Sequence, residues 1–153
     1  MNYRLFTADD FDALYAIEEI CFQPPLRFER PYMAELIRAK NSATWIAEAD
    51  RVMVGFAIVD WRTTSRGILA YVPTIEVLPA YRGLGVGREL LRLLEQSAQE
   101  AGAFAIGLHV DVQNTEAIRL YESQAYVRLG MDRDFYGQGR AAYMYKKEFP
   151  KVE

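Results

Sequence analysis

The stretch that decides the fold reads Thr74-Ile-Glu-Val-Leu-Pro-Ala-Tyr-Arg-Gly-Leu-Gly-Val-Gly-Arg-Glu-Leu-Leu91. An apolar run ends near Val77, three alternate glycines follow, and an amphipathic pattern of helical spacing extends to about Ala101. Glycine lets main-chain N–H groups turn toward a ligand, and the free N–H groups at a helix start favour a phosphate or pyrophosphate. The stretch therefore predicts a strand, an anion-binding loop and a helix, in that order.

The spacing of the glycines excludes the two commonest phosphate loops. The dinucleotide fingerprint would need a third glycine where Arg88 stands, and the P-loop would need Gly-Lys-Ser/Thr after the glycines. What remains is Arg82-x-x-Gly85-x-Gly87, in which the arginine adds a fixed positive charge. The alternative is a glycine turn that only starts a helix.

Outward from this stretch, the chain alternates apolar runs with helical patterns. Pro24 and Pro25 interrupt regular structure after a first helix capped by Asp9 or Asp10. Strands are expected at 3–6, 44–48, 52–61, 67–77, 104–112, 126–131 and 141–147, and further helices at 31–39 and 114–123. Without a repeat or a linker, this order predicts a single α+β domain over residues 1–153.

Composition narrows the function. The 153 residues are 51% hydrophobic and 25% charged, with a formal charge of −3, which argues against general nucleic-acid binding. Cys21 is the single cysteine, so we expect no disulfide within the chain and no four-cysteine zinc site. The one cysteine and one histidine could in principle form a Cys21–His109 nucleophilic pair, but the residues around Cys21 do not resemble the surroundings of a catalytic cysteine. No apolar stretch reaches the ~20 residues that span a bilayer, so we expect a cytoplasmic protein without membrane or nucleic-acid partners.

A second group of residues follows the predicted strand at 104–112. Asn114 is placed to cap a helix, and Tyr121 comes seven residues later. Positions 114, 118 and 121 lie on one helical stripe that rises ~10.5 Å, enough to follow an extended ligand. The alternative reading makes Tyr121 a core aromatic residue.

Together, these two motifs resemble the GNAT superfamily of N-acetyltransferases, whose signature is Q/R-x-x-G-x-G/A, and the resemblance covers nearly the whole chain. It implies a mixed, mostly antiparallel central sheet of about six to seven strands with about four helices, splayed at the central strand. It also implies acetyl-CoA as cosubstrate and no metal. The residues that it assigns to the coenzyme are Ile75, Val77, Arg82, Gly83, Leu84, Gly85, Val86, Gly87, Arg88, Asn114 and Tyr121.

Within the superfamily, the sequence is most similar to N-terminal protein acetyltransferases, both the bacterial ribosomal-protein-alanine type and one eukaryotic type. The match to the eukaryotic type includes Tyr71, Leu108-His109-Val110, Asn114 and Tyr121. The bacterial type usually has Glu at the position of His109, so the identity of the base stays open.

The resemblance implies direct attack of an amine on the thioester. Tyr121 is the expected acid for the departing sulfur, and His109 the expected base, acting through a water held with Tyr71. Glu76 is the alternative base. The oxyanion is expected at a main-chain N–H near Val77.

A protein or peptide N-terminus is the favoured acceptor. An α-amine is about a tenth neutral at pH 7, whereas a lysine is neutral about once in 2,500 molecules, so a weak, water-relayed base suits the α-amine. Phe22, Pro24 and Tyr136 are the candidates for its apolar pocket. A small amine such as a polyamine, amino acid or drug is the alternative acceptor, and a CoA-binding module without turnover is a third interpretation. Acyl-chain preference and the choice between monomer and homodimer stay open.

Overall fold

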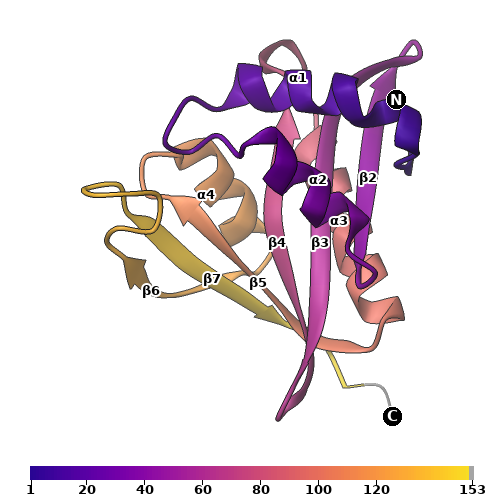
Figure 1. Ribbon diagram of the computed structural model, residues 1–153. Helices are drawn as coiled ribbons and strands as arrows, with labels where there is room; N and C mark the ends of the chain where they lie inside the picture. Colours follow the sequence, from indigo (N-terminus) through magenta and orange to yellow (C-terminus); the bar gives the residue numbers. More distant parts are fainter. Residues whose placement is uncertain (152–153) are drawn as a thin grey trace.

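A seven-stranded sheet runs through the computed structural model, which describes residues 1–151, and helices cover both of its faces (Figure 1). The strands are β1 (Asn2–Leu5), β2 (Ser42–Ala49), β3 (Val52–Thr64), β4 (Gly67–Val77), β5 (Ala103–Asp111), β6 (Val127–Asp132) and β7 (Ala142–Glu148). The helices are α1 (Phe11–Cys21), α2 (Arg30–Arg38), α3 (Val86–Glu100) and α4 (Thr115–Ser123), with short 3-10 turns at Ala8–Asp10 and Pro79–Tyr81.

The strand order is β1-β2-β3-β4-β5-β7-β6, and every neighbouring pair is antiparallel except β4 and β5. The parallel pair requires a crossover, which α3 supplies between them. The predicted α+β fold with a mixed, mostly antiparallel sheet is therefore confirmed.

The sheet opens between β4 and β5. Their pairing joins 68–72 to 103–108 and then stops, although β4 continues to Val77, where β3 is its one partner strand among the described residues. In Figure 1 the upper parts of the two strands diverge, and α4 lies behind the opening. This confirms the predicted splay, which leaves unpaired main chain at the end of β4.

An extra residue in β4 lies just before the opening. Ile58 of β3 faces Thr74, but Asp60 faces Tyr71, so β4 advances three residues where β3 advances two. Pro73 falls within this bulge, where its missing N–H removes no regular ladder bond. The bulge resets the alternation of side chains, so that Tyr71 and Glu76 lie on the same face.

Two apolar cores flank the sheet. The core on the α3 side includes Ala70, Val72, Leu90 and Leu94 and also takes in Tyr121. The core on the α1–α2 side includes Leu14, Met33, Phe56 and Ile58. The two cores hold β4 from both faces.

The start of α1 differs from the prediction. Asp10 precedes the helix, but its carboxylate accepts the N–H of Thr7 at 2.7 Å and two hydrogen bonds from Arg4 at 2.7 and 2.8 Å. It therefore does not cap α1 with its side chain. The Asp10 carboxylate binds Arg4 rather than the free N–H groups at the start of α1, because a charged, bidentate hydrogen bond is stronger than a bond to a main-chain N–H.

Candidate active site

The glycine loop presents open main chain at the start of α3. Gly83 and Gly85 have φ values of +76° and +84°, and a Cβ built on either would meet nothing within 4 Å. A Cβ on Gly87 would lie 3.4 Å from Leu120 of α4, so this glycine allows the two helices to approach. Leu84, between Gly83 and Gly85, is 69% exposed.

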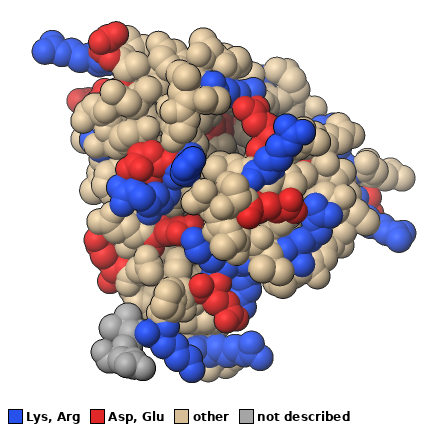
Figure 2. Space-filling view, turned by 180° about the vertical axis from the view of Figure 1, so that it is seen from behind, with Lys and Arg blue, Asp and Glu red and all other residues tan. Residues whose placement is uncertain are grey.

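A cavity of about 840 Å³ lies between this loop, the end of β4, α4 and the loop after α1. In the rear view of Figure 2, acidic and basic side chains are mixed over the face that α3 and α4 cover. The cavity brings together most residues predicted to bind the coenzyme or acceptor: Phe22, Pro24, Ile75, Val77, Arg82, Gly83, Gly85, Val86, Gly87, Arg88, Asn114 and Tyr121. Glu76, the predicted alternative base, also lines it. Leu84, Tyr71, His109 and Tyr136 are not in its lining.

Four arginines line this cavity, together with the acidic side chains of Glu76, Asp111 and Glu116. Arg82 and Arg88 were predicted, and the described residues add Arg119 of α4 and Arg140 of the β6–β7 loop. The Arg82 Nε donates to the carbonyl of Val77 at 2.9 Å, and Arg140 pairs with Asp111 at 2.8 Å. Sequence reasoning missed Arg119 and Arg140, because an arginine on an exposed helix face or in a distant loop carries no local signal.

Asn114 caps α4, as the sequence predicts. Its Oδ1 accepts the N–H of Ala117 at 3.1 Å, and the cap fixes the side chain at the cavity wall. For the amide NH₂ of Asn114, no hydrogen-bond acceptor is found within residues 1–151, so that group is available to a ligand.

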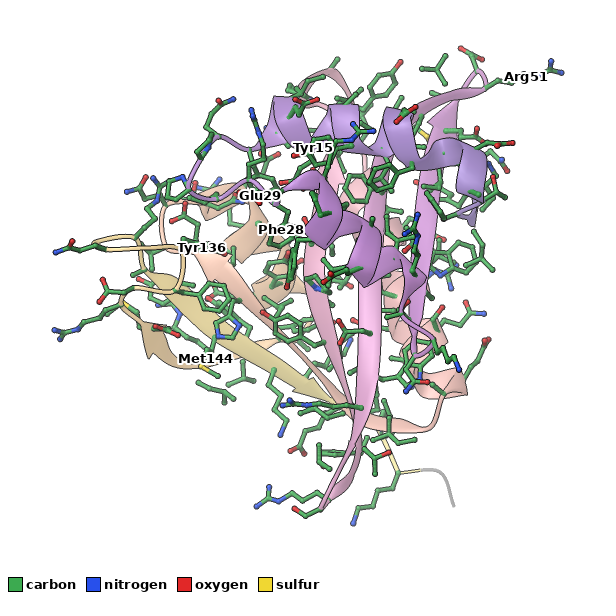
Figure 3. The ribbon with its side chains drawn as sticks, viewed as in Figure 1. Tyr15, Phe28, Glu29, Arg51, Tyr136 and Met144 are labelled. Carbon is green, nitrogen blue, oxygen red and sulfur yellow. The ribbon has the colours of Figure 1, made fainter. Side chains whose placement is uncertain are left out.

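Tyr71, His109, Tyr121 and Tyr136 gather at the opening of the sheet. The Tyr71 hydroxyl lies 2.7 Å from Nδ1 of His109, and the imidazole stacks on Phe135 at 4.0 Å between ring centroids. Tyr121 of α4 is close enough to both tyrosines that Tyr71 raises its pKa and that it raises the pKa of Tyr136 in turn. Tyr136 projects from the β6–β7 loop (Figure 3). The two faces of the sheet thus contribute to one site.

Burial keeps the acid–base groups neutral. It raises the pKa of the Tyr121 phenol, and the neighbouring Tyr71 raises it further. Burial also raises the pKa of Tyr71 and Tyr136, and it lowers the pKa of His109. A neutral phenol and a neutral imidazole are therefore present together near pH 7, as general acid–base chemistry requires.

Glu76, the alternative base, has a different setting. It is 2% exposed and accepts a hydrogen bond from the Thr74 hydroxyl at 2.7 Å. Burial raises its pKa well above the ordinary value, and the carboxyl of Glu18 on α1 raises it further. Sequence reasoning missed Glu18, although it lies four residues after Leu14 on the apolar stripe of α1.

A second cavity, of about 500 Å³, lies on the other side of the Tyr71–His109 pair. Both residues line it, with Asp60 at one wall and apolar walls from Leu69, Leu129 and Met144 (Figure 3). The site therefore has two approaches, one along the glycine loop and one across the strands.

Residues 1–151 lack two features, a metal-binding cluster and a membrane-spanning helix. They contain no group of three or more His, Cys, Asp or Glu side chains that could hold a metal ion. Within the same range, no helix is both long and apolar enough to cross a bilayer.

The family model described as "Acetyltransferase (GNAT) family" matches residues 11–126. An N-alpha-acetyltransferase of Sulfurisphaera tokodaii is 28% identical over 94% of this chain and 91% of its own length. The N-alpha-acetyltransferase RimI of Mycobacterium tuberculosis is 32% identical over 82% of this chain and 75% of its own. Three other curated relatives are longer, and the chain matches 33%, 53% and 34% of their lengths.

The solved structure of Arabidopsis thaliana Naa50 with the bisubstrate analogue CoA-Ac-MVNAL has a similar fold. It superposes with a TM-score of 0.83 at 24% identity, over 97% of this chain and 98% of that one.

Proposed function

This chain belongs to the GNAT family of acetyltransferases, and on that premise we propose that it moves the acetyl group of acetyl-CoA to the α-amine of a protein or peptide N-terminus. The observation that carries the proposal is that the buried Tyr121 phenol, whose pKa Tyr71 raises, lies near the hydrogen-bonded Tyr71–His109 pair at the opening between β4 and β5. An acid from one face and a base from the other fit a thioester that lies between them.

The larger cavity suits the coenzyme. The open main chain at Gly83 and Gly85 and the arginines at its wall favour the diphosphate. Asn114 and Tyr121 follow along α4 toward the opening, in the direction of the pantetheine arm. The thioester would then end beside the Tyr121 hydroxyl.

Acyl transfer proceeds by direct attack of the neutral amine on the thioester carbonyl. With its proton on Nδ1, His109 donates to the Tyr71 oxygen and keeps the Nε2 lone pair free. A water bound there takes the amine proton as the C–N bond forms and passes a proton to Nε2. The carbonyl re-forms as the C–S bond breaks, and the Tyr121 phenol gives its proton to the departing sulfur.

The relatives and three apolar or aromatic side chains support a peptide acceptor. Two curated relatives named N-alpha-acetyltransferases match most of the chain. Phe22 and Pro24 line the larger cavity from the loop after α1, and Tyr136 lies in the β6–β7 loop (Figure 3). This arrangement suits an extended peptide end, and a neutral α-amine needs only the weak base present.

A thiol-release assay with acetyl-CoA tests the acceptor. The matched pair is one peptide with a free N-terminus and the same peptide with a blocked N-terminus and an internal lysine; spermidine is the small-amine arm. We expect release with the free N-terminus, at a rate that depends on the first two residues. Faster release with spermidine, or equal release with the blocked peptide, would overturn the proposal.

A further inference from the structure

Two buried carboxyls meet between α1 and β4 without enough donors for their oxygens. Glu18 is 0% exposed and Glu76 2%. The Oε2 of Glu18 accepts the Phe28 N–H at 3.1 Å, and the Oε2 of Glu76 accepts the Thr74 hydroxyl at 2.7 Å. The Oε1 atoms of both are buried with no hydrogen-bond partner in the described part of the chain. Helix α1 packs on β4, and the Glu18 carboxyl is near enough to raise the pKa of Glu76.

Two negative charges in contact in an apolar setting are strongly disfavoured. One proton held between the two Oε1 atoms removes this repulsion and gives each atom a partner in a single charge-assisted O–H···O bond. We propose that Glu18 and Glu76 share one proton, and that this carboxyl pair positions the loop 22–28 against β4.

The carboxyl pair reaches the loop through Phe28. Its N–H is held by Glu18, and its carbonyl accepts the Tyr15 hydroxyl at 2.8 Å, so α1 fixes both main-chain groups (Figure 3). On the other side, Glu76 lies in β4 at the opening of the sheet. The pair therefore connects the loop that carries Phe22 and Pro24 to the strand beside the reacting groups. Its effect on the acceptor rests on the proposed function; its effect on stability does not.

The shared proton makes the pair sensitive to pH. Burial raises the pKa of Glu76 in the folded chain, so the native state keeps a proton that the unfolded state releases. Stability from this group is therefore present at acid pH and is lost as the pH rises. The other titratable and charged groups around the pair are Cys21, which adjoins Glu76, and Arg82, whose guanidinium lies 3.6 Å from the Cys21 sulfur.

Glu18→Gln replaces the shared proton with a permanent donor. The amide can donate to Glu76 and still accept the Phe28 N–H, so the loop should stay in place. We expect the melting temperature of this variant to exceed that of the unmodified chain by an amount that grows about 3–5 °C per pH unit above pH 5. Glu19→Gln, an equal charge change at the exposed neighbouring position, should show no such growth.

The kinetic arm uses Glu18→Ala, which removes the acceptor of the Phe28 N–H. Its KM for the acceptor peptide should rise about tenfold or more, the size of one lost charge-assisted hydrogen bond, with kcat within about threefold. Hydrogen exchange at the Phe28 amide should quicken in this variant and not in Glu18→Gln, which reports on the loop without any turnover.

A temperature difference between Glu18→Gln and the unmodified chain that stays flat from pH 5 to pH 9 would overturn the shared proton. An unchanged acceptor KM in Glu18→Ala, with unchanged exchange at Phe28, would overturn the positioning role. Glu76 would be the base instead if Glu76→Gln lowered kcat about a hundredfold and its difference in melting temperature from the unmodified chain did not change with pH. If no amine is acetylated at all, the proposed function fails, but melting and exchange still decide the inference.

Discussion

Replacement of Tyr121 by Phe removes one oxygen from the point where the two approaches meet. The structure predicts a small effect on folding. No hydrogen bond to the Tyr121 hydroxyl is found within residues 1–151, and the ring keeps its neighbours Tyr126 and Tyr145 at 5.9 and 6.4 Å. The free energy of unfolding should therefore change by less than about 1 kcal/mol.

The effect on turnover should be large. Without the phenol, the sulfur departs as an unprotonated thiolate. Loss of a positioned general acid lowers the rate about 10²–10⁴-fold, which corresponds to roughly 2.7–5.4 kcal/mol in the barrier. Since burial raises the pKa of Tyr121 above the ordinary value, the unmodified enzyme should also show no alkaline loss of kcat from this group below about pH 10.

The assay combines single-turnover thiol release with calorimetric binding of acetyl-CoA. The matched control is Tyr126→Phe, because Tyr126 is equally buried in the same aromatic cluster but donates to Glu95 at 2.8 Å. It should lose about 1 kcal/mol of stability and keep its rate. A Tyr121→Phe variant within about threefold of normal kcat would refute the acid role, as would a loss of rate matched by an equal loss of acetyl-CoA affinity.

Three further predictions test the loop, the base and the core. Gly85→Leu should weaken coenzyme binding at least about tenfold by calorimetry. Gly139→Leu is the matched control: its left-handed residue (φ +76°) should cost the same strain, about 1–2 kcal/mol. It should bind the coenzyme normally, because Gly139 lies outside the cavity. Because burial lowers the pKa of His109, kcat/KM divided by the neutral fraction of the peptide amine should rise with pH and reach half its plateau below pH 6.5; a His109→Gln variant that keeps this limb would reassign it. Leu94→Ala, fully buried between α3 and the sheet, should lose about 2–5 kcal/mol in chemical denaturation, and a loss below 1 kcal/mol would contradict its place in the core.

The sequence predicts best what short-range chemistry determines. The glycine loop and α3 were predicted because a left-handed turn, free N–H groups and an apolar stripe all leave local signals. Asn114 was predicted as a cap for the same reason. The cap of α1 was predicted wrongly, because the carboxylate of Asp10 is taken by Arg4, which reaches it from the neighbouring strand.

The parts of the site that were missed depend on distant pairing. Arg140 is held at the cavity wall by its hydrogen bond to Asp111, which lies 29 residues earlier in the chain. Glu18 lies on an apolar stripe, which signals a buried carboxyl, but its partner Glu76 is in another element and no local pattern joins them. Pro73 within an apolar run is a signal for a bulge, although the run alone does not give the register that it produces.

That bulge makes the length of β4 as important as its composition. Deleting Pro73 would restore strict alternation, and every side chain from there to the glycine loop would exchange sides. Thr74 and Glu76 would then turn toward the leucines of α3, and Ile75 and Val77 toward Glu18. In this segment, substitutions should therefore be tolerated far better than insertions or deletions. An insertion or deletion here would misplace the side chains of the catalytic centre, although every sequence motif would still be present.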